Sequence, residues 1–132
     1  MTVIIIFSVE PERQQELVDT TVDFLSTVKQ QPGFISSSIN KSTDGNKFAN
    51  YAQWRSLEIY QAFVNNSDMQ AKGAKLSEFD KPDSHVYEVV ISESKFGRLE
   101  ISEGGYIAHL AEFWMQPKKQ PRVELVKEIA LF

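Results

Sequence analysis

The stretch FISSSINKSTDGNKFANYAQW, residues 34–54, has the pattern of a β-hairpin. Residues 34–42 alternate in polarity as a strand does, and residues 47–54 form a second such run. Between them, Asp44-Gly45 is a strong hairpin signal, because a tight turn needs residues that tolerate positive φ. The stretch therefore predicts two antiparallel strands joined by a short turn.

Before this hairpin, the sequence predicts a buried strand followed by a helix. Residues 2–9 form a β-branched apolar run, typical of a strand buried on both faces. Glu10-Pro11-Glu12 then opens a helix, since proline suits the first helical position and acidic residues favour the helix dipole there. Apolar residues recur at helical spacing from Leu17 to Val28, and Gln31-Pro32-Gly33 ends the helix.

After the hairpin, a second helical region leads to another strand. Ser56 is a candidate cap for a helix with Leu57, Tyr60, Phe63 and Val64 on one side. Ser67-x-x-Gln70 has the capping-box pattern and predicts a second helical piece that reaches about Phe79. Residues 80–83 are expected to form a loop, and residues 85–92 a fourth strand.

The resulting order, βαββαβ, predicts an α+β fold of the ferredoxin-like type, with one antiparallel sheet and two helices on one face. The other face still carries apolar residues and should be covered. A second copy of the chain is the simplest cover. We therefore expect a homodimer whose two sheets face each other as a dimeric α/β barrel.

Residues 94–132 are expected to be a C-terminal extension to a domain of residues 1–93. Tyr106–Trp114 is a candidate extra strand, and residues 119–131 are a candidate helix. This end resembles the beginning of the chain, because both contain Glu-Leu-Val after a strand and a proline. The extension is either a partial second βα repeat or a chance likeness.

Composition excludes several classes of function. The 132 residues carry a net charge of −4 without a Lys/Arg stripe, which argues against a nucleic-acid partner. There is no cysteine, and His85 and His109 are the two imidazoles, so no metal site is expected. The apolar run at residues 3–7 is too short to span a membrane and has no basic lead, so the expected location is the cytoplasm.

Three polar or aromatic side chains are candidates for a binding site. Alternate residues of a strand share a face, so Asn50 and Trp54 should point the same way, about 13 Å apart. Tyr60, on the following helix, can fold back over that face. The span between Asn50 and Trp54 would frame a flat molecule of several fused rings, and all three side chains could converge between the sheet and the helices. Core packing is the alternative, because Trp and Tyr are common core residues.

Four motifs follow one another along the chain: Pro32-Gly33-Phe34, a serine-rich strand, Asp44-Gly45, and Asn50-Tyr51-x-x-Trp54-x-Ser56-x-Glu58-x-Tyr60. Together they resemble the antibiotic biosynthesis monooxygenase family, and the resemblance extends across about residues 1–92. The resemblance implies that Asn50, Trp54 and Tyr60 bind the substrate and assist oxygen activation. It also implies that no metal, flavin or haem is needed, because the ionised substrate itself reduces oxygen.

These observations lead to two hypotheses. The first is a cofactor-independent monooxygenase or quinol oxidase that takes a small aromatic or polyketide-like substrate and molecular oxygen, with Asn50, Trp54 and Tyr60 as catalytic residues. The alternative is a non-catalytic small-molecule-binding or interaction protein of the same fold. Haem-degrading proteins that share the fold resemble one another in an Asn on the first strand and a His on the second helix. Here residues 3–9 contain no Asn and residues 67–79 contain no His, which argues against haem degradation.

Overall fold

A computed structural model of the chain describes residues 1–95, 110–111, 113–115 and 123–124. The chain divides into two compact units, Met1–Glu93 and Ser94–Phe132. None of the helices in these described ranges is long and apolar enough to cross a membrane.

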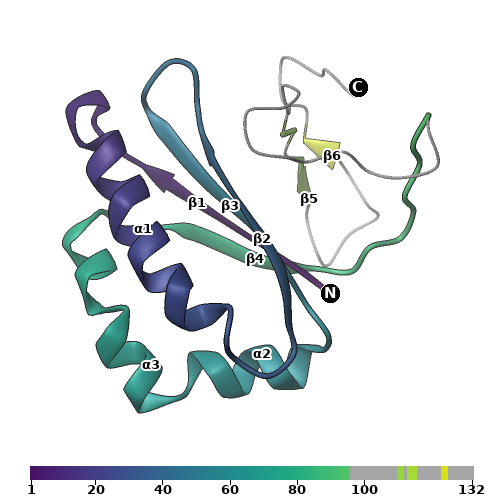
Figure 1. Ribbon diagram of the computed structural model, residues 1–132. Helices are drawn as coiled ribbons and strands as arrows, with labels where there is room; N and C mark the ends of the chain where they lie inside the picture. The colour runs from purple at the N-terminus through teal and green to yellow at the C-terminus, as the bar shows by residue number, and fades with distance from the viewer. Residues whose placement is uncertain (96–109, 112, 116–122, 125–132) are drawn as a thin grey trace. The chain divides into compact units, whose positions relative to one another are not determined.

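The first unit contains a four-stranded antiparallel sheet with helices on one face (Figure 1). The strands lie in the order β2-β3-β1-β4. Their bounds are β1 Thr2–Ser8, β2 Phe34–Lys41, β3 Lys47–Trp54 and β4 Asp83–Tyr87. The element order and the antiparallel sheet confirm the predicted α+β ferredoxin-like fold.

The helical segments lie where the sequence predicts them, with two differences in detail. They are η1 Pro11–Arg13, α1 Gln14–Val28, α2 Leu57–Val64, α3 Ser67–Lys72 and η2 Ala74–Glu78, the two η segments being 3-10 helices. The first helix thus opens with a 3-10 turn at its proline. The second helical piece changes from α to 3-10 at Gly73, where an added Cβ would lie 3.0 Å from the Phe24 ring.

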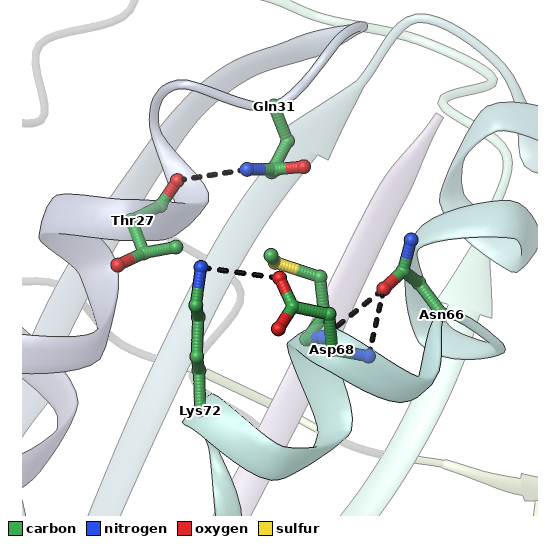
Figure 2. Close-up of polar contacts among 6 residues, drawn as sticks. Thr27, Gln31, Asn66, Asp68 and Lys72 are labelled. Atoms are coloured by element: carbon green, nitrogen blue, oxygen red, sulfur yellow. Dashed lines mark hydrogen bonds and ion pairs between the residues drawn. The ribbon is translucent and has the colours of Figure 1, made fainter.

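The cap of α3 differs from the prediction. The Ser67-x-x-Gln70 capping box is wrong, because the N-cap residue is Asn66. Its Oδ1 accepts from the backbone N–H of Asp68 at 3.0 Å and of Met69 at 3.1 Å (Figure 2). The Gln70 amide donates instead to a carbonyl of α2. Asn is among the best N-cap residues, which explains why it takes this position from the adjacent serine.

The fourth strand is shorter than predicted and begins earlier. Residues 85–92 were expected, whereas β4 is Asp83–Tyr87. Its pairing with β1 runs from Asp83 opposite Ile6 to Tyr87 opposite Thr2. Because β1 begins at Thr2, residues after Tyr87 have no further β1 strand residue to pair with, and the strand ends.

In the second unit, two short strands pair, β5 Trp114–Met115 and β6 Val123–Glu124. The predicted strand Tyr106–Trp114 is wrong at residues 110, 111 and 113, which lie outside any strand. The predicted helix over 119–131 is wrong at Val123–Glu124, whose backbone is engaged in the ladder with β5. At Trp114 the strand prediction is met, because this residue belongs to β5. The remaining positions of both predictions lie outside the described residues.

The core of the first unit lies between the sheet and the helices. On the helix-covered face, β1 and β3 contribute the pairs Val3–Ala52, Ile5–Asn50 and Phe7–Phe48. Two clusters of buried residues follow, one of Val3, Val28, Ala52 and Trp54 and the other of Phe7, Leu17, Phe48 and Phe79. The far face of the same strands carries the pairs Ile4–Tyr51 and Ile6–Ala49.

Candidate active site

A cavity of about 350 Å³ lies between the helix-covered face of the sheet and the helices. Aliphatic and aromatic side chains from β1, β3, α1 and α2 form most of its lining. Polar groups come from Thr21, Ser37, Asn50, Tyr60, Ser77 and Ser84. Pockets that bind small molecules are mostly apolar, have a few polar groups and measure about 300–1,000 Å³.

Asn50 faces this cavity from the middle of β3. Its pairing partners are Ile5 on β1 and Ile39 on β2, so its side chain emerges on the helix-covered face with theirs. The Ser37 hydroxyl donates to the Asn50 Oδ1 at 2.6 Å. In the described part of the chain, the Asn50 NH2 group has no hydrogen-bond acceptor, which leaves two donors available to a ligand.

Trp54 lies at the end of β3 and is 2% exposed. The amino terminus fixes this end of the strand, since the Met1 ammonium donates to the Trp54 carbonyl at 2.9 Å. Three aromatic rings surround the indole, those of Phe34, Tyr60 and Phe63, at centroid distances of 5.5, 5.6 and 4.8 Å. The side chain both packs in the core and lines the cavity.

Tyr60 reaches the cavity from α2, whose start is fixed by Ser56. The Ser56 hydroxyl accepts from the Ile59 N–H at 3.2 Å, as predicted for a cap. Burial raises the pKa of the Tyr60 phenol above its usual value, and the Ser84 side chain partly opposes that shift. The phenol therefore stays protonated near neutral pH and can donate a hydrogen bond.

Asn50, Trp54 and Tyr60 thus line one cavity on the helix-covered side of the sheet. Their catalytic role stays a prediction. In the described residues, the lining includes no Asp, Glu, Lys, Arg or His, and no group of three or more His, Asp or Glu side chains could hold a metal ion. His85 lies outside the lining, 61% exposed and 2.7 Å from Asp83.

The sequence did not identify Ser37 or Ser84 as candidates, although both line the cavity. Simple alternation from Phe34 would place Ser36 and Ser38 on the helix-covered face. A register shift between Phe34 and Ser36 adds one residue to β2, so Ser37 lies opposite Ala52 on that face instead. A bulge of this kind leaves no recognisable signal in a run of three serines.

Comparison with known proteins places the first unit in one family. The sequence model of the antibiotic biosynthesis monooxygenase family matches residues 1–74, more than half of the chain. Over 70 residues, the chain is 40% identical to tetracenomycin-F1 monooxygenase of Streptomyces glaucescens. That match covers 52% of this chain and 62% of the relative's length.

Solved structures with the same fold include two oxygenases. A monooxygenase of Streptomyces coelicolor, in complex with nanaomycin D, is 27% identical with a TM-score of 0.59, covering 70% of this chain and 91% of that one. A cofactor-independent oxygenase from Streptomyces nogalater is 17% identical with a TM-score of 0.55. The match covers 69% of this chain and 93% of that one. The second likeness shows the fold alone.

Proposed function

The chain belongs to the antibiotic biosynthesis monooxygenase family, and on that premise we propose that it is a cofactor-independent monooxygenase or quinol oxidase of a small aromatic or polyketide-like compound. The observation that carries the proposal is the cavity, where Asn50, Trp54 and Tyr60 add hydrogen-bond donors to a mostly apolar lining. The relatives support it, since one is named for tetracenomycin F1 and another holds nanaomycin D.

The three side chains would take different parts in the reaction. A flat substrate lies against the aromatic cluster, with Trp54 stacking on it or donating its indole N–H. The Asn50 NH2 group and the Tyr60 phenol donate to an oxygen of the substrate that becomes negatively charged. The apolar lining keeps water from the reactive anion.

The chemistry balances with the substrate as the sole source of electrons. When an anthrone is oxidised, its methylene carbon loses two hydrogens and gains one oxygen atom, and the second atom of O2 leaves in water. When a hydroquinone is oxidised to the quinone, two protons and two electrons pass to O2 and give hydrogen peroxide. Neither reaction requires an external reductant.

Proton removal would depend on stabilising the anion. The described lining includes no carboxylate, imidazole or ammonium group. Hydrogen bonds from Asn50 and Tyr60 to the substrate oxygen favour its ionised form and lower its pKa. The proton then leaves to solvent as the anion forms, and the electron-rich anion reacts with oxygen.

We also propose that the protein acts as a homodimer in the cytoplasm. The apolar side chains Ile4 and Ile6 on the far face of the sheet favour a dimer in which two such faces meet. Light scattering at micromolar concentration should give about twice the chain mass, and a clean monomer would contradict this assembly. Cell fractionation tests the location.

Oxygen consumption with a panel of hydroquinones and anthrones tests the activity, with and without chelator. Tyr60→Phe should lower turnover about tenfold, because each 1.4 kcal/mol of lost transition-state stabilisation is about a factor of ten in rate. Tyr51→Phe, on the far face of the sheet, is the matched control and should keep it. Ligand binding without oxygen uptake would instead support a non-catalytic binding protein, and loss of activity with chelator would contradict cofactor independence.

A further inference from the structure

The cavity contains a serine–asparagine pair that bears on how a ligand is recognised. Ser37 on β2 lies diagonally across from Asn50, because Ser37 pairs with Ala52 and Ile39 with Asn50. Both side chains line the cavity. The bulge near Phe34 produces this arrangement, since an unshifted β2 would turn the Ser37 side chain to the far face.

The geometry of the pair defines which amide atom faces the serine. The Ser37 Oγ and the Asn50 Oδ1 are 2.6 Å apart. That distance suits an O–H···O bond, whereas N–H···O bonds are usually about 2.9–3.0 Å long. The hydroxyl is therefore the donor and the amide oxygen the acceptor. The NH2 group, on the other branch of the planar amide, has no protein acceptor in the described residues.

We propose that Ser37 is a positioning residue that makes Asn50 a donor toward the cavity. A free amide can rotate and present either its oxygen or its NH2 group to a ligand. With its oxygen bonded to Ser37, Asn50 presents the NH2 group. The ligand atom next to Asn50 is then a carbonyl or phenolate oxygen, and a hydroxyl or amine hydrogen in that place has no partner.

This inference rests on the proposed function for the identity of the substrate, but it concerns binding and is tested without turnover. 1-Tetralone and tetralin are a suitable pair of probes, because they share one bicyclic skeleton and only the first carries a carbonyl oxygen. Calorimetry measures the affinity of each for the whole protein. The ratio of the two affinities reports the contribution of the carbonyl contact.

Ser37→Ala should weaken 1-tetralone binding about threefold to tenfold, the loss expected for one misoriented neutral hydrogen bond. Tetralin binding should stay the same, which a general loosening of the cavity would not produce. Ser37→Thr keeps the hydroxyl and should restore the wild-type ratio. The matched control is Ser36→Ala, which removes a hydroxyl that donates to the Gln53 Oε1 at 3.2 Å on the other face of the sheet.

Each outcome decides the proposal. An unchanged ratio in Ser37→Ala, with a reduced ratio in Asn50→Ala, would show that Asn50 binds the carbonyl without help from Ser37. Equal weakening of both probes would assign Ser37 a structural role. No preference for 1-tetralone in the wild type would also overturn it. A ratio that falls in both Ser37→Ala and Asn50→Ala but not in Ser36→Ala, in a protein that consumes no oxygen, would support positioning and refute the oxygenase. A ratio that falls in Ser37→Ala but not in Asn50→Ala would overturn the proposal, because Ser37 would then act without Asn50.

Discussion

The Trp54 indole and the Phe63 ring lie with centroids 4.8 Å apart and their planes at 34°. This contact joins the end of β3 to α2, and Phe34 meets the same indole edge-on from β2. Aromatic pairs of this kind contribute about 0.5–1.5 kcal/mol each beyond the area they bury. One side chain therefore stabilises the fold and forms a wall of the cavity.

We expect Trp54→Phe to affect both properties. Loss of the larger ring leaves a void at a nearly fully buried position, so the free energy of unfolding should fall by about 1–3 kcal/mol in urea titrations. Turnover should fall about tenfold or more if the indole N–H contacts the transition state. Phe79→Leu, in the other core cluster and outside the cavity lining, should lose stability and keep turnover. Unchanged turnover in Trp54→Phe would restrict this residue to packing.

Local sequence patterns predicted the regular parts of the fold because each has a short-range physical cause. Alternation along β3 placed Asn50 and Trp54 on one face, and both line the cavity. Features that depend on distant partners were missed. The end of β4 depends on where β1 begins, and the orientation of Ser37 depends on a bulge in its pairing with β3.

The Tyr60 phenol should titrate above the usual tyrosine range. Burial raises its folded pKa above the unfolded value of about 10. The stability linked to this group is therefore complete below about pH 10 and is lost as the pH rises through the folded pKa, because the unfolded chain then ionises first. Absorbance titration near 295 nm should show a late transition that Tyr60→Phe removes.

Two comparisons check that the late absorbance transition belongs to the Tyr60 phenol. In strong denaturant, wild type and Tyr60→Phe should titrate over the same range and differ in amplitude alone. Turnover corrected for ionisation of the substrate should not decline between pH 7 and about pH 9. A decline there that Tyr60→Phe abolishes would mean that the phenol ionises early, and its role as a donor would be wrong.

Asn66→Ala should destabilise the first unit by about 1 kcal/mol, the usual loss for an N-cap residue. The variant removes the acceptor for the Asp68 and Met69 N–H groups. Ser67→Ala is the matched control at the neighbouring position and should change stability by less than about 0.5 kcal/mol. Thermal and urea unfolding measure both. A larger loss in Ser67→Ala would restore the capping box predicted from the sequence.

Gly33 lies in the turn before β2, with a φ of +78°, and its position bears on the cavity through α2. A Cβ at Gly33 would lie 2.5 Å from the Ile59 Cγ2. Gly33→Ala should therefore combine an unfavourable left-handed backbone, about 1–2 kcal/mol, with displacement of α2. Because Tyr60 follows Ile59 on that helix, we expect turnover to fall with stability.

Two further variants separate the strained backbone from the contact with Ile59. At Gly45 the φ is similar, +84°, but the nearest atoms to an added Cβ belong to Pro11, the closest at 3.1 Å, and not to a residue of α2. Gly45→Ala therefore tests the backbone strain without the contact with Ile59. It should lose stability and keep turnover. In Gly33→Ala/Ile59→Ala, removal of the clashing side chain should make the combined loss smaller than the sum of the single losses, because the two positions are in contact. Additive losses would show that backbone strain alone acts, and that the turn does not control the position of Tyr60.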